Sequence, residues 1–289
     1  MRVTEGRMIE RAGDAVTQSR QRVQQASQQI SSGIRVAKAS DDPTAWAAGA
    51  RARARAVLDD ARSSAVSRAS DRLGETERAL VSVNDDLGRA SELATQLASD
   101  TYGAADRRSG AVEIRALRSS ILASLDARDA EGSALFGGTL TGSPPFDATG
   151  AYRGDQGSAS IEIADGTRVD IGLPGDRVSG GAGRDLIGLL DTLAVALDAN
   201  DGAAIRASLD ELRGSSDQVI DARSEVGRRM SAMQRANDTR ADVGVVLDAQ
   251  IERLVGADPI TAATDLARAS SGLAAARAAA EHMMQILQS

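Results

Sequence analysis

The sequence predicts a mainly α-helical protein whose long coiled-coil or bundle arms run from both termini to a small β-rich insert, making it α+β overall. Three observations carry this prediction. Three of the 5 prolines lie between residues 144 and 174. Half of the 28 glycines lie between Gly132 and Gly188. On both sides of this central segment, apolar residues recur with the alternating spacing of three and four residues that is typical of packed helices.

The first expected element is a helix over residues 9–33. Its mainly apolar and small residues recur every three or four positions and form a packing seam, with Arg, Gln and Ser between them. The group Ser40-Asp41-Asp42-Pro43 ends this segment, and either Ser40 or Asp42 is expected to cap the next helix, with Pro43 in its first turn. The seam positions are Ile9, Ala12, Val16, Ser19, Val23, Ala26, Ile30 and Gly33.

Two further helices are expected before the insert, over residues 44–99 and 106–130. The group Asp100-Thr101-Tyr102-Gly103 separates them. The seam of the longer helix comprises Leu73, Thr76, Leu80, Val83, Leu87, Ala90, Ala94 and Leu97, and the shorter helix is expected to turn Val112, Leu117, Ile121, Leu122 and Leu125 inward.

The central segment changes to the two-residue period of β-strands. Ile161 and Ile163 alternate with polar residues, as do Val169 and Ile171, and Asp165-Gly166 between them predicts a hairpin. Residues 135–139 and 151–154 are interpreted as further short strands or turns. Phe136, Phe146 and Tyr152 are expected to form the core of this small β module.

Helix is expected to return over residues 184–199, and Asn200-Asp201-Gly202 closes it. A long helix follows from Ile205 to Leu254, with several polar residues in its seam. Ala257-Asp258-Pro259 breaks this helix as Asp42-Pro43 broke the first arm. The seam of the last helix comprises Ala262, Leu266, Ala269, Leu273, Ala276, Ala280, Met283 and Leu287.

This order of elements suggests three domains. They are a terminal coiled coil (residues 1–42 with 256–289), a long-helix bundle (43–134 with 184–255) and a β insert (135–183). A pair of terminal helices with small seam residues buries little apolar area, so it is expected to associate with itself or with a larger assembly. The predicted subunit-contact residues are Ile9, Val16, Val23, Ile30, Leu266, Leu273, Ala280, Met283 and Leu287.

Composition excludes many kinds of chemistry. There is no cysteine, His282 is the only histidine, and the single lysine, Lys38, precedes alanine, so thiol chemistry and a Walker-type phosphate loop are excluded. The adjacent aspartates are interpreted as caps or solvated faces. We therefore expect no enzyme, no catalytic residue, no metal and no cofactor.

The net charge of −7 disfavours a nucleic-acid partner. No apolar run is long enough to span a membrane, so no membrane association is expected. The first ten residues lack the apolar core of a cleavable signal peptide, which by itself favours a cytoplasmic location.

The segment from Ser31 to Pro43 (SSGIRVAKASDDP) closely resembles a segment of the flagellin superfamily. Leu135-Phe136-Gly137-Gly138-Thr139, followed by Pro145-Phe146 and by Tyr152-Arg153-Gly154-Asp155, resembles the hook-associated branch found at the hook–filament junction. Two further segments are also consistent with this resemblance, Val226-Gly227-Arg228-Arg229 and Ala257-Asp258-Pro259. The last five residues, Gln285–Ser289, differ from the usual end of a flagellin.

This resemblance implies a structural subunit of the bacterial flagellum, which forms the junction layer between the hook and the flagellin filament. The implied partners are further copies in a ring, the hook-side hook-associated protein, flagellin and an export chaperone. The resemblance also implies type III export without a cleaved signal to the extracellular flagellum, which replaces the cytoplasmic expectation. Two alternatives stay open: a flagellin that forms the filament itself, and a cytoplasmic coiled-coil scaffold protein.

Overall fold

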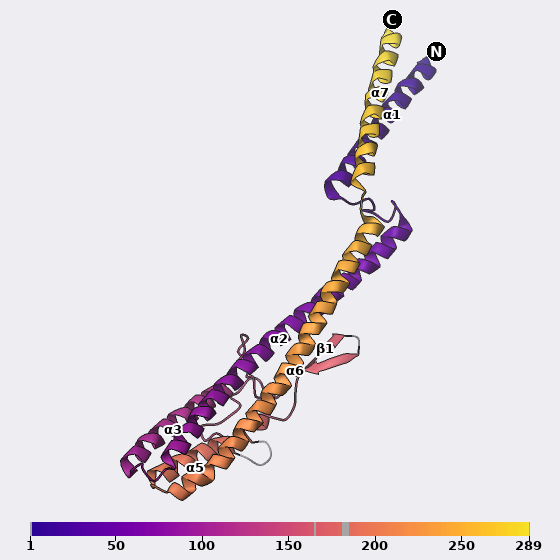
Figure 1. The fold of residues 1–289 in the computed structure, drawn as a ribbon. Coiled ribbons are helices and arrows are strands. Elements are labelled where there is room, and N and C mark those ends of the chain that lie inside the picture. Colours follow the sequence, from indigo (N-terminus) through magenta and orange to yellow (C-terminus); the bar gives the residue numbers. More distant parts are fainter. Residues whose placement is uncertain (1, 165, 181–184, 289) are drawn as a thin grey trace. The chain divides into compact units, whose positions relative to one another are not determined.

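The computed structural model describes residues 2–164, 166–180 and 185–288, and these residues are mainly helical with one small antiparallel sheet (Figure 1). The expected fold class is confirmed. The helices are α1 (Arg2–Ser32), α2 (Pro43–Leu97), α3 (Ala104–Leu125), α4 (Asp176–Ser179), α5 (Leu186–Asp198), α6 (Gly202–Val255) and α7 (Pro259–Gln288), and the strands are β1 (Ser160–Ala164) and β2 (Thr167–Asp170).

The chain divides into two compact units. The first unit comprises Met1–Asp59 with Asp242–Ser289, and the second comprises Asp60–Ala241. Helices α2 and α6 each contribute to both units, because the boundaries lie inside them. The expected division into terminal, long-helix and β domains remains a proposal.

The second unit has one hydrophobic core, to which α2, α3, α5 and α6 contribute. The predicted α2 seam from Leu73 to Leu97 is buried throughout. In α6 a fully buried residue recurs every seven positions, as expected for a helix that packs along most of its length. These α6 residues are Ile205, Leu212, Val219, Val226 and Met233.

The prediction for α3 needs two corrections. The helix ends at Leu125, not at residue 130, because the chain turns back and the amide of Leu135 donates to the carbonyl of Ala127 at 3.0 Å. Val112 is 66% exposed, whereas Ile114 is fully buried. The buried stripe contains Ala111, and the residue that follows it on a helix points about 100° away.

The β hairpin is confirmed, with Ile161 opposite Val169, although the expected turn residue Asp165 lies outside the described residues. Residues 135–139 and 151–154 form turns and isolated bridges. Phe136 and Phe146 do not form a separate β core. They are buried in the same hydrophobic cluster as the helices, and the Phe146 and Tyr152 rings lie 5.4 Å apart at 55°.

The expected helix after the insert begins at Leu186, while residue 184 lies outside the described residues. Its buried face includes Leu186, Leu189, Leu190, Leu193 and Leu197. The carboxylate of Asp185 caps this helix by accepting from the amide of Gly188 at 2.9 Å. The α5–α6 turn then passes through Asn200, whose φ is 56°. Asp201 accepts from the amides of Ala203 and Ala204 and so caps α6.

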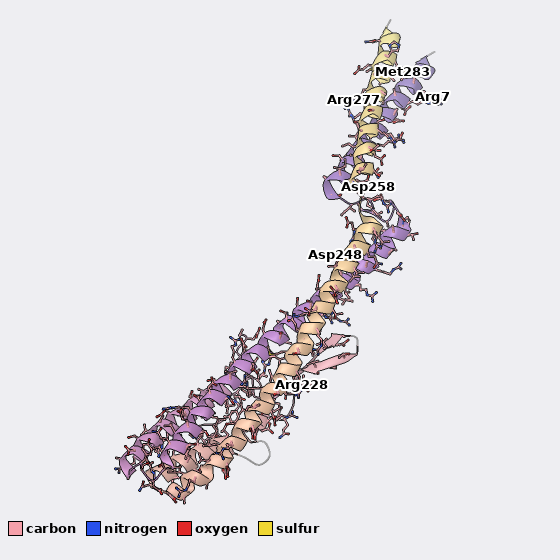
Figure 2. The ribbon with its side chains drawn as sticks, in the orientation of Figure 1. Arg7, Arg228, Asp248, Asp258, Arg277 and Met283 are labelled. Carbon is pink, nitrogen blue, oxygen red and sulfur yellow. The ribbon has the colours of Figure 1, made fainter. Side chains whose placement is uncertain are left out.

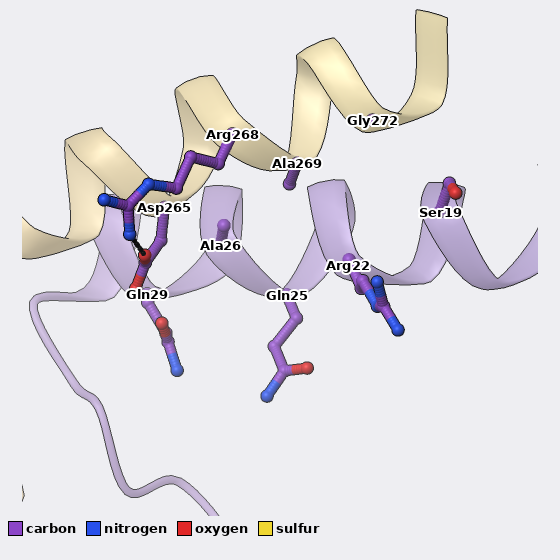
Figure 3. A pocket seen from close by; sticks show the side chains of 9 residues that line it. All are labelled: Ser19, Arg22, Gln25, Ala26, Gln29, Asp265, Arg268, Ala269 and Gly272. Carbon is purple, nitrogen blue, oxygen red and sulfur yellow. Dashed lines mark ion pairs between the residues drawn. The ribbon is translucent and has the colours of Figure 1, made fainter. Parts of the chain in front are cut away.

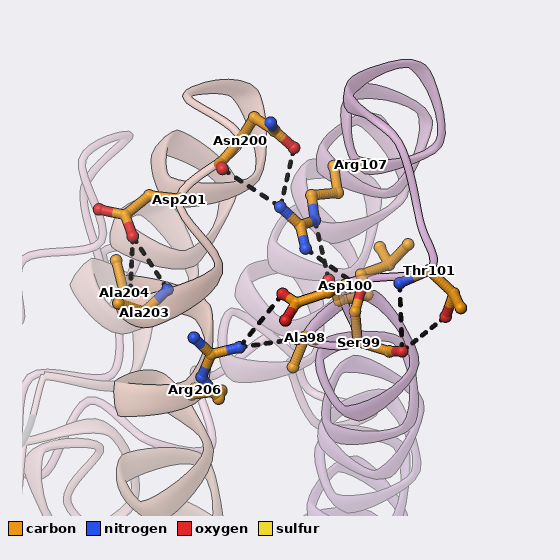
Figure 4. Close-up of polar contacts among 11 residues, drawn as sticks. Ala98, Ser99, Asp100, Thr101, Arg107, Asn200, Asp201, Ala203, Ala204 and Arg206 are labelled. Atoms are coloured by element: carbon orange, nitrogen blue, oxygen red, sulfur yellow. Dashed lines mark hydrogen bonds and ion pairs between the residues drawn. The ribbon is translucent and has the colours of Figure 1, made fainter.

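Arg107 connects this turn to the end of α2 (Figure 4). Its guanidinium is almost fully buried and donates to the carbonyls of Leu97 and Ser99 at 3.0 and 3.2 Å. It also donates to the side-chain oxygen of Asn200 at 2.8 Å. Beside it, Arg206 donates to the carbonyl of Ala98 at 3.0 Å. Two cations thereby satisfy the carbonyls at the C-terminal end of α2, where the helix dipole is negative.

Candidate assembly surface

In the first unit, α1 packs against α7 along a narrow stripe of small and medium-sized side chains. On α7 the least exposed positions coincide with the predicted seam from Ala262 to Met283. On α1 they include Ala12, Val16, Ser19, Val23 and Ala26, of which Ala26 is buried. The stripe contains six of the nine predicted contact residues: Val16, Val23, Leu266, Leu273, Ala280 and Met283.

The remaining predicted contact residues are placed differently. Ile30 is 43% exposed, and Gln29 takes the less exposed position beside it. The side chains of Ile9 and Leu287 lie outside the described part of the structure. A role for any of these nine residues in contacts between subunits remains a proposal.

The small seam residues leave a pocket along the α1–α7 pair (Figure 3). Its lining includes the small residues Ala26, Ala269 and Gly272. Polar side chains also line it, including Gln25 and Arg22. The outer surface of the pair is also charged, with Arg7 on α1 and Arg277 on α7 both exposed (Figure 2). Two helices with this composition bury little apolar surface by themselves.

Backbone hydrogen bonds connect the residues that follow α1 (33–36) with the residues between α6 and α7 (255–257). We call this arrangement the joint. Gly33 ends α1 with a φ of 67°, a conformation that other residues rarely adopt. Its carbonyl accepts from the amide of Ala257 at 2.8 Å, and the carbonyl of Val255 accepts from the amide of Arg35 at 2.8 Å. Val36 beside it is only 1% exposed. The flagellin-like segment from Ser31 to Pro43 therefore forms this joint.

Two Asp-Pro pairs cap the helices that leave the joint. Of the two caps that the sequence allowed, Ser40 and Asp42, it is Asp42 that accepts from the amide of Ala45 at 2.9 Å and caps α2. Asp258 accepts from the hydroxyl and amide of Thr261 at 2.6 and 3.2 Å and caps α7. The hydrogen bond from the Thr261 hydroxyl is the main reason why the pKa of Asp258 is lowered. Both caps fix where a helix begins next to the joint.

The Leu135–Thr139 motif forms a closed turn in the second unit, held by Asp155. This carboxylate accepts from the amides of Thr139 and Gly157 at 2.7 and 3.0 Å, and from the Thr139 hydroxyl. These bonds lower the pKa of Asp155, the Thr139 hydroxyl contributing most. The Tyr152 hydroxyl donates to the carbonyls of Phe136 and Asp155, and burial raises its pKa to about 12. The two parts of the sequence motif therefore stabilise one another.

The described residues contain no group of histidine, aspartate and glutamate side chains arranged to hold a metal ion. Among the same residues, no helix combines the length and apolar character needed to cross a membrane. The features that the structure does present are helix seams, caps and turns.

Comparison with known proteins finds similarities to proteins of the bacterial flagellum. Residues 7–141 match the family described as the bacterial flagellin N-terminal helical region. The chain is 25% identical to flagellar hook-associated protein 3 of Salmonella typhimurium, over 89% of each chain. The protein of the same name from Escherichia coli is also 25% identical over 89% of each chain.

Solved structures share the fold. A flagellar hook-associated protein from Vibrio parahaemolyticus superposes with a TM-score of 0.70 and 22% identity, covering 75% of this chain and all of that one. FlgL of Xanthomonas campestris gives a TM-score of 0.62 at 21% identity, covering 70% of this chain and 99% of that one. The fold of this chain is therefore the one seen in these hook-associated proteins of the bacterial flagellum. Residues 7–141 are thus similar to the N-terminal helical region of bacterial flagellins, and the two curated relatives, which match over 89% of the chain, are hook-associated proteins.

Proposed function

We propose that this protein is a structural subunit of the hook–filament junction, where it adapts the hook-side lattice to the flagellin filament. The observation that carries this proposal is the similarity to flagellar hook-associated protein 3 over 89% of both chains. A match of this extent leaves only about a tenth of either chain uncovered. The family is one of structural components, and catalysis plays no part in the proposed function.

The structure supports this proposal through its terminal helices. The α1–α7 pair buries few large side chains, and its pocket is lined by small and polar residues. Such a pair gains stability when neighbouring helices cover it. The predicted contact residues Val23 and Leu273 are only partly buried in the single chain, so that a neighbour can still cover them.

The proposal extends to partners and location. Copies of the chain form a ring, which binds the hook-side hook-associated protein on one face and flagellin on the other. An export chaperone holds the chain before secretion. The protein reaches the extracellular flagellum by type III export, without a cleaved signal peptide. Nucleic acids and membranes are not partners in this proposal.

The ability to polymerise distinguishes a junction subunit from a flagellin. A filament subunit offers matching surfaces on its two axial faces and adds to itself without limit, whereas a junction subunit matches different neighbours above and below. Purified protein seeded with sheared filaments is therefore expected to stay monomeric or to add one terminal layer. Electron microscopy of the seeded sample makes this measurement, with purified flagellin as the matched control.

Cells that lack the protein provide the second test. They are expected to build hooks and to release flagellin into the medium, because the junction layer on which the filament assembles is missing. Immunogold label on intact wild-type cells is expected at the boundary of hook and filament. Growth of the pure protein into long filaments would instead identify it as a flagellin, and label confined to the cytoplasm would favour a scaffold protein.

A further inference from the structure

Helices α2 and α6 form an antiparallel pair in the first unit. The amides of Arg35 and Val36 both donate to the carbonyl of Val255, which places the start of α2 near the end of α6. The two helices come close at Gly49, where an added Cβ would lie 2.6 Å from Cγ1 of Val255. The least exposed stripe of the pair contains Ala52, Ala56 and Asp59 of α2 and Gly244, Leu247, Ile251 and Leu254 of α6.

This stripe divides the remaining residues into two sides. Successive helical residues point about 100° apart, so residues just before the stripe positions face one side and residues just after them face the other. In an antiparallel pair of right-handed helices, the preceding positions of both helices share a side. The basic side comprises Arg51, Arg55, Leu58, Val243, Val246 and Arg253, and the acidic side comprises Arg53, Val57, Val245, Asp248 and Glu252.

Both sides expose large aliphatic residues that the single chain does not cover. Leu58 is 64% and Val246 61% exposed on the basic side, and Val57 is 67% and Val245 70% exposed on the acidic side. Single exposed residues of this kind are ordinary, but here they lie together on two sides of one short helix pair. Each side therefore has an apolar patch next to charged residues.

The charges of the two sides are complementary. The basic side has three arginines and no carboxylate, whereas the acidic side has two carboxylates and one arginine. Within the described part of the chain, Arg51, Arg55, Asp248 and Glu252 form no ion pair. Arg51 and Arg55 are four residues apart on one helix, where like charges repel and an external carboxylate is favourable.

We propose that the basic side of one copy packs against the acidic side of the next copy of this chain, which buries the aliphatic residues and pairs arginines with carboxylates. This inference rests on the proposed function and names one surface through which the ring closes. Because the two sides differ, the contact is heterologous: every copy uses both sides, and a closed ring leaves neither exposed.

Cysteine cross-linking tests the contact directly, because the chain has no cysteine of its own. Leu58→Cys and Val245→Cys, placed in one chain, lie on opposite sides of the helix pair. Mild oxidation of intact flagella is expected to link neighbouring copies into a ladder of multimers on a gel. The matched control joins Leu58→Cys to Val195→Cys, since Val195 is 63% exposed on α5, and no ladder is expected from it.

Charge reversal tests the pairing. Arg51→Glu with Arg55→Glu, or Asp248→Arg with Glu252→Arg, is expected to abolish motility while the circular dichroism of the monomer is unchanged. The quadruple variant restores opposite charges between neighbours and is expected to recover motility. A quadruple variant that folds as the monomer does and stays immotile would overturn the proposal.

The two proposals can fail separately. Immunogold label at the junction without any Leu58–Val245 cross-link would refute this contact and leave the junction function standing. Absence of label from the flagellum would refute the junction function itself. A cross-link ladder together with motility restored in the quadruple variant supports the contact.

Discussion

Arg107 shows how one side chain can hold three helix ends. It is 5% exposed, and its bonds reach the end of α2 and the turn between α5 and α6. A planar guanidinium supplies several donors in fixed directions, which an amine does not. The sequence did not reveal this role, because Arg107 is one of many arginines on helices and its acceptors are backbone carbonyls that carry no sequence signal.

Replacing Arg107 with methionine is expected to lower the free energy of unfolding by at least about 2 kcal/mol, since buried carbonyls lose their donors. Urea denaturation of the purified protein measures this effect. Arg108→Met is the matched control, because Arg108 is exposed on the same helix. Equal stability of the two variants would show that the Arg107 bonds contribute little.

Asp155 provides a residue-scale prediction about acid. Its pKa in the fold lies below the ordinary value, so its stabilisation is complete above about pH 4 and disappears as the pH falls further, through the lower folded pKa. The amide signals of Thr139 and Gly157 in NMR spectra are expected to shift only below about pH 4. Asp155→Asn is expected to remove this acid transition, whereas Asp170→Asn on β2 should preserve it.

At the scale of elements, heptad spacing predicted most of the helices. The seams of α2 and α7 are found where the sequence placed them, because a sustained spacing of three and four fixes both the helix and its buried face. The shorter α3 was less well predicted. Its apolar residues fit more than one phase, and the tertiary packing of the second unit, in which α3 contacts α5, buries Ile114 and leaves Val112 exposed.

The joint and the central turns could be predicted only in part. Asp42-Pro43 and Asp258-Pro259 are local signals, so the breaks and caps beside the joint follow from the sequence. The bonds from Arg35 and Val36 to Val255 connect backbone atoms far apart in the chain and depend on no particular side chain. Likewise, Asp155 holds the turn at Thr139 through tertiary contacts that no short-range pattern reports.

The α1–α7 seam gives a prediction at this scale. Leu273→Asp introduces a charge on the partly buried face of α7 and is expected to abolish assembly and motility, because an unpaired charge is costly to cover. The thermal unfolding of the second unit should not change, since its core lies elsewhere. Ser271→Asp, at an exposed position of α7, is the control and should remain motile. Motile Leu273→Asp cells would show that this face needs no cover.

At the scale of the whole molecule, the two units differ in how they are stabilised. The second unit has a core of large aliphatic and aromatic residues from several elements. In the terminal helices of the first unit, Ala26 and Ala262 are among the few buried side chains. Local opening is easier where few apolar contacts must be broken.

Trypsin is therefore expected to trim the monomer first at its ends, after Arg20, Arg22, Arg268 and Arg277, and to leave the second unit intact. Mass spectrometry of timed digests identifies the order of cleavage. The same sites should become protected when the protein is part of a flagellum. Simultaneous cleavage at the ends and inside the second unit would contradict this difference between the units.

The joint also has an optical consequence. The only tryptophan of the chain, Trp46, lies in the first turn of α2 and is 40% exposed, and the only lysine, Lys38, lies in the loop just before it. The tryptophan fluorescence of this protein therefore originates beside the joint. An acceptor dye attached to the side-chain amine of Lys38 would lie eight residues before this tryptophan. The unmodified sequence thus contains a spectroscopic donor and an attachment point for an acceptor, placed to report on the joint as copies come together.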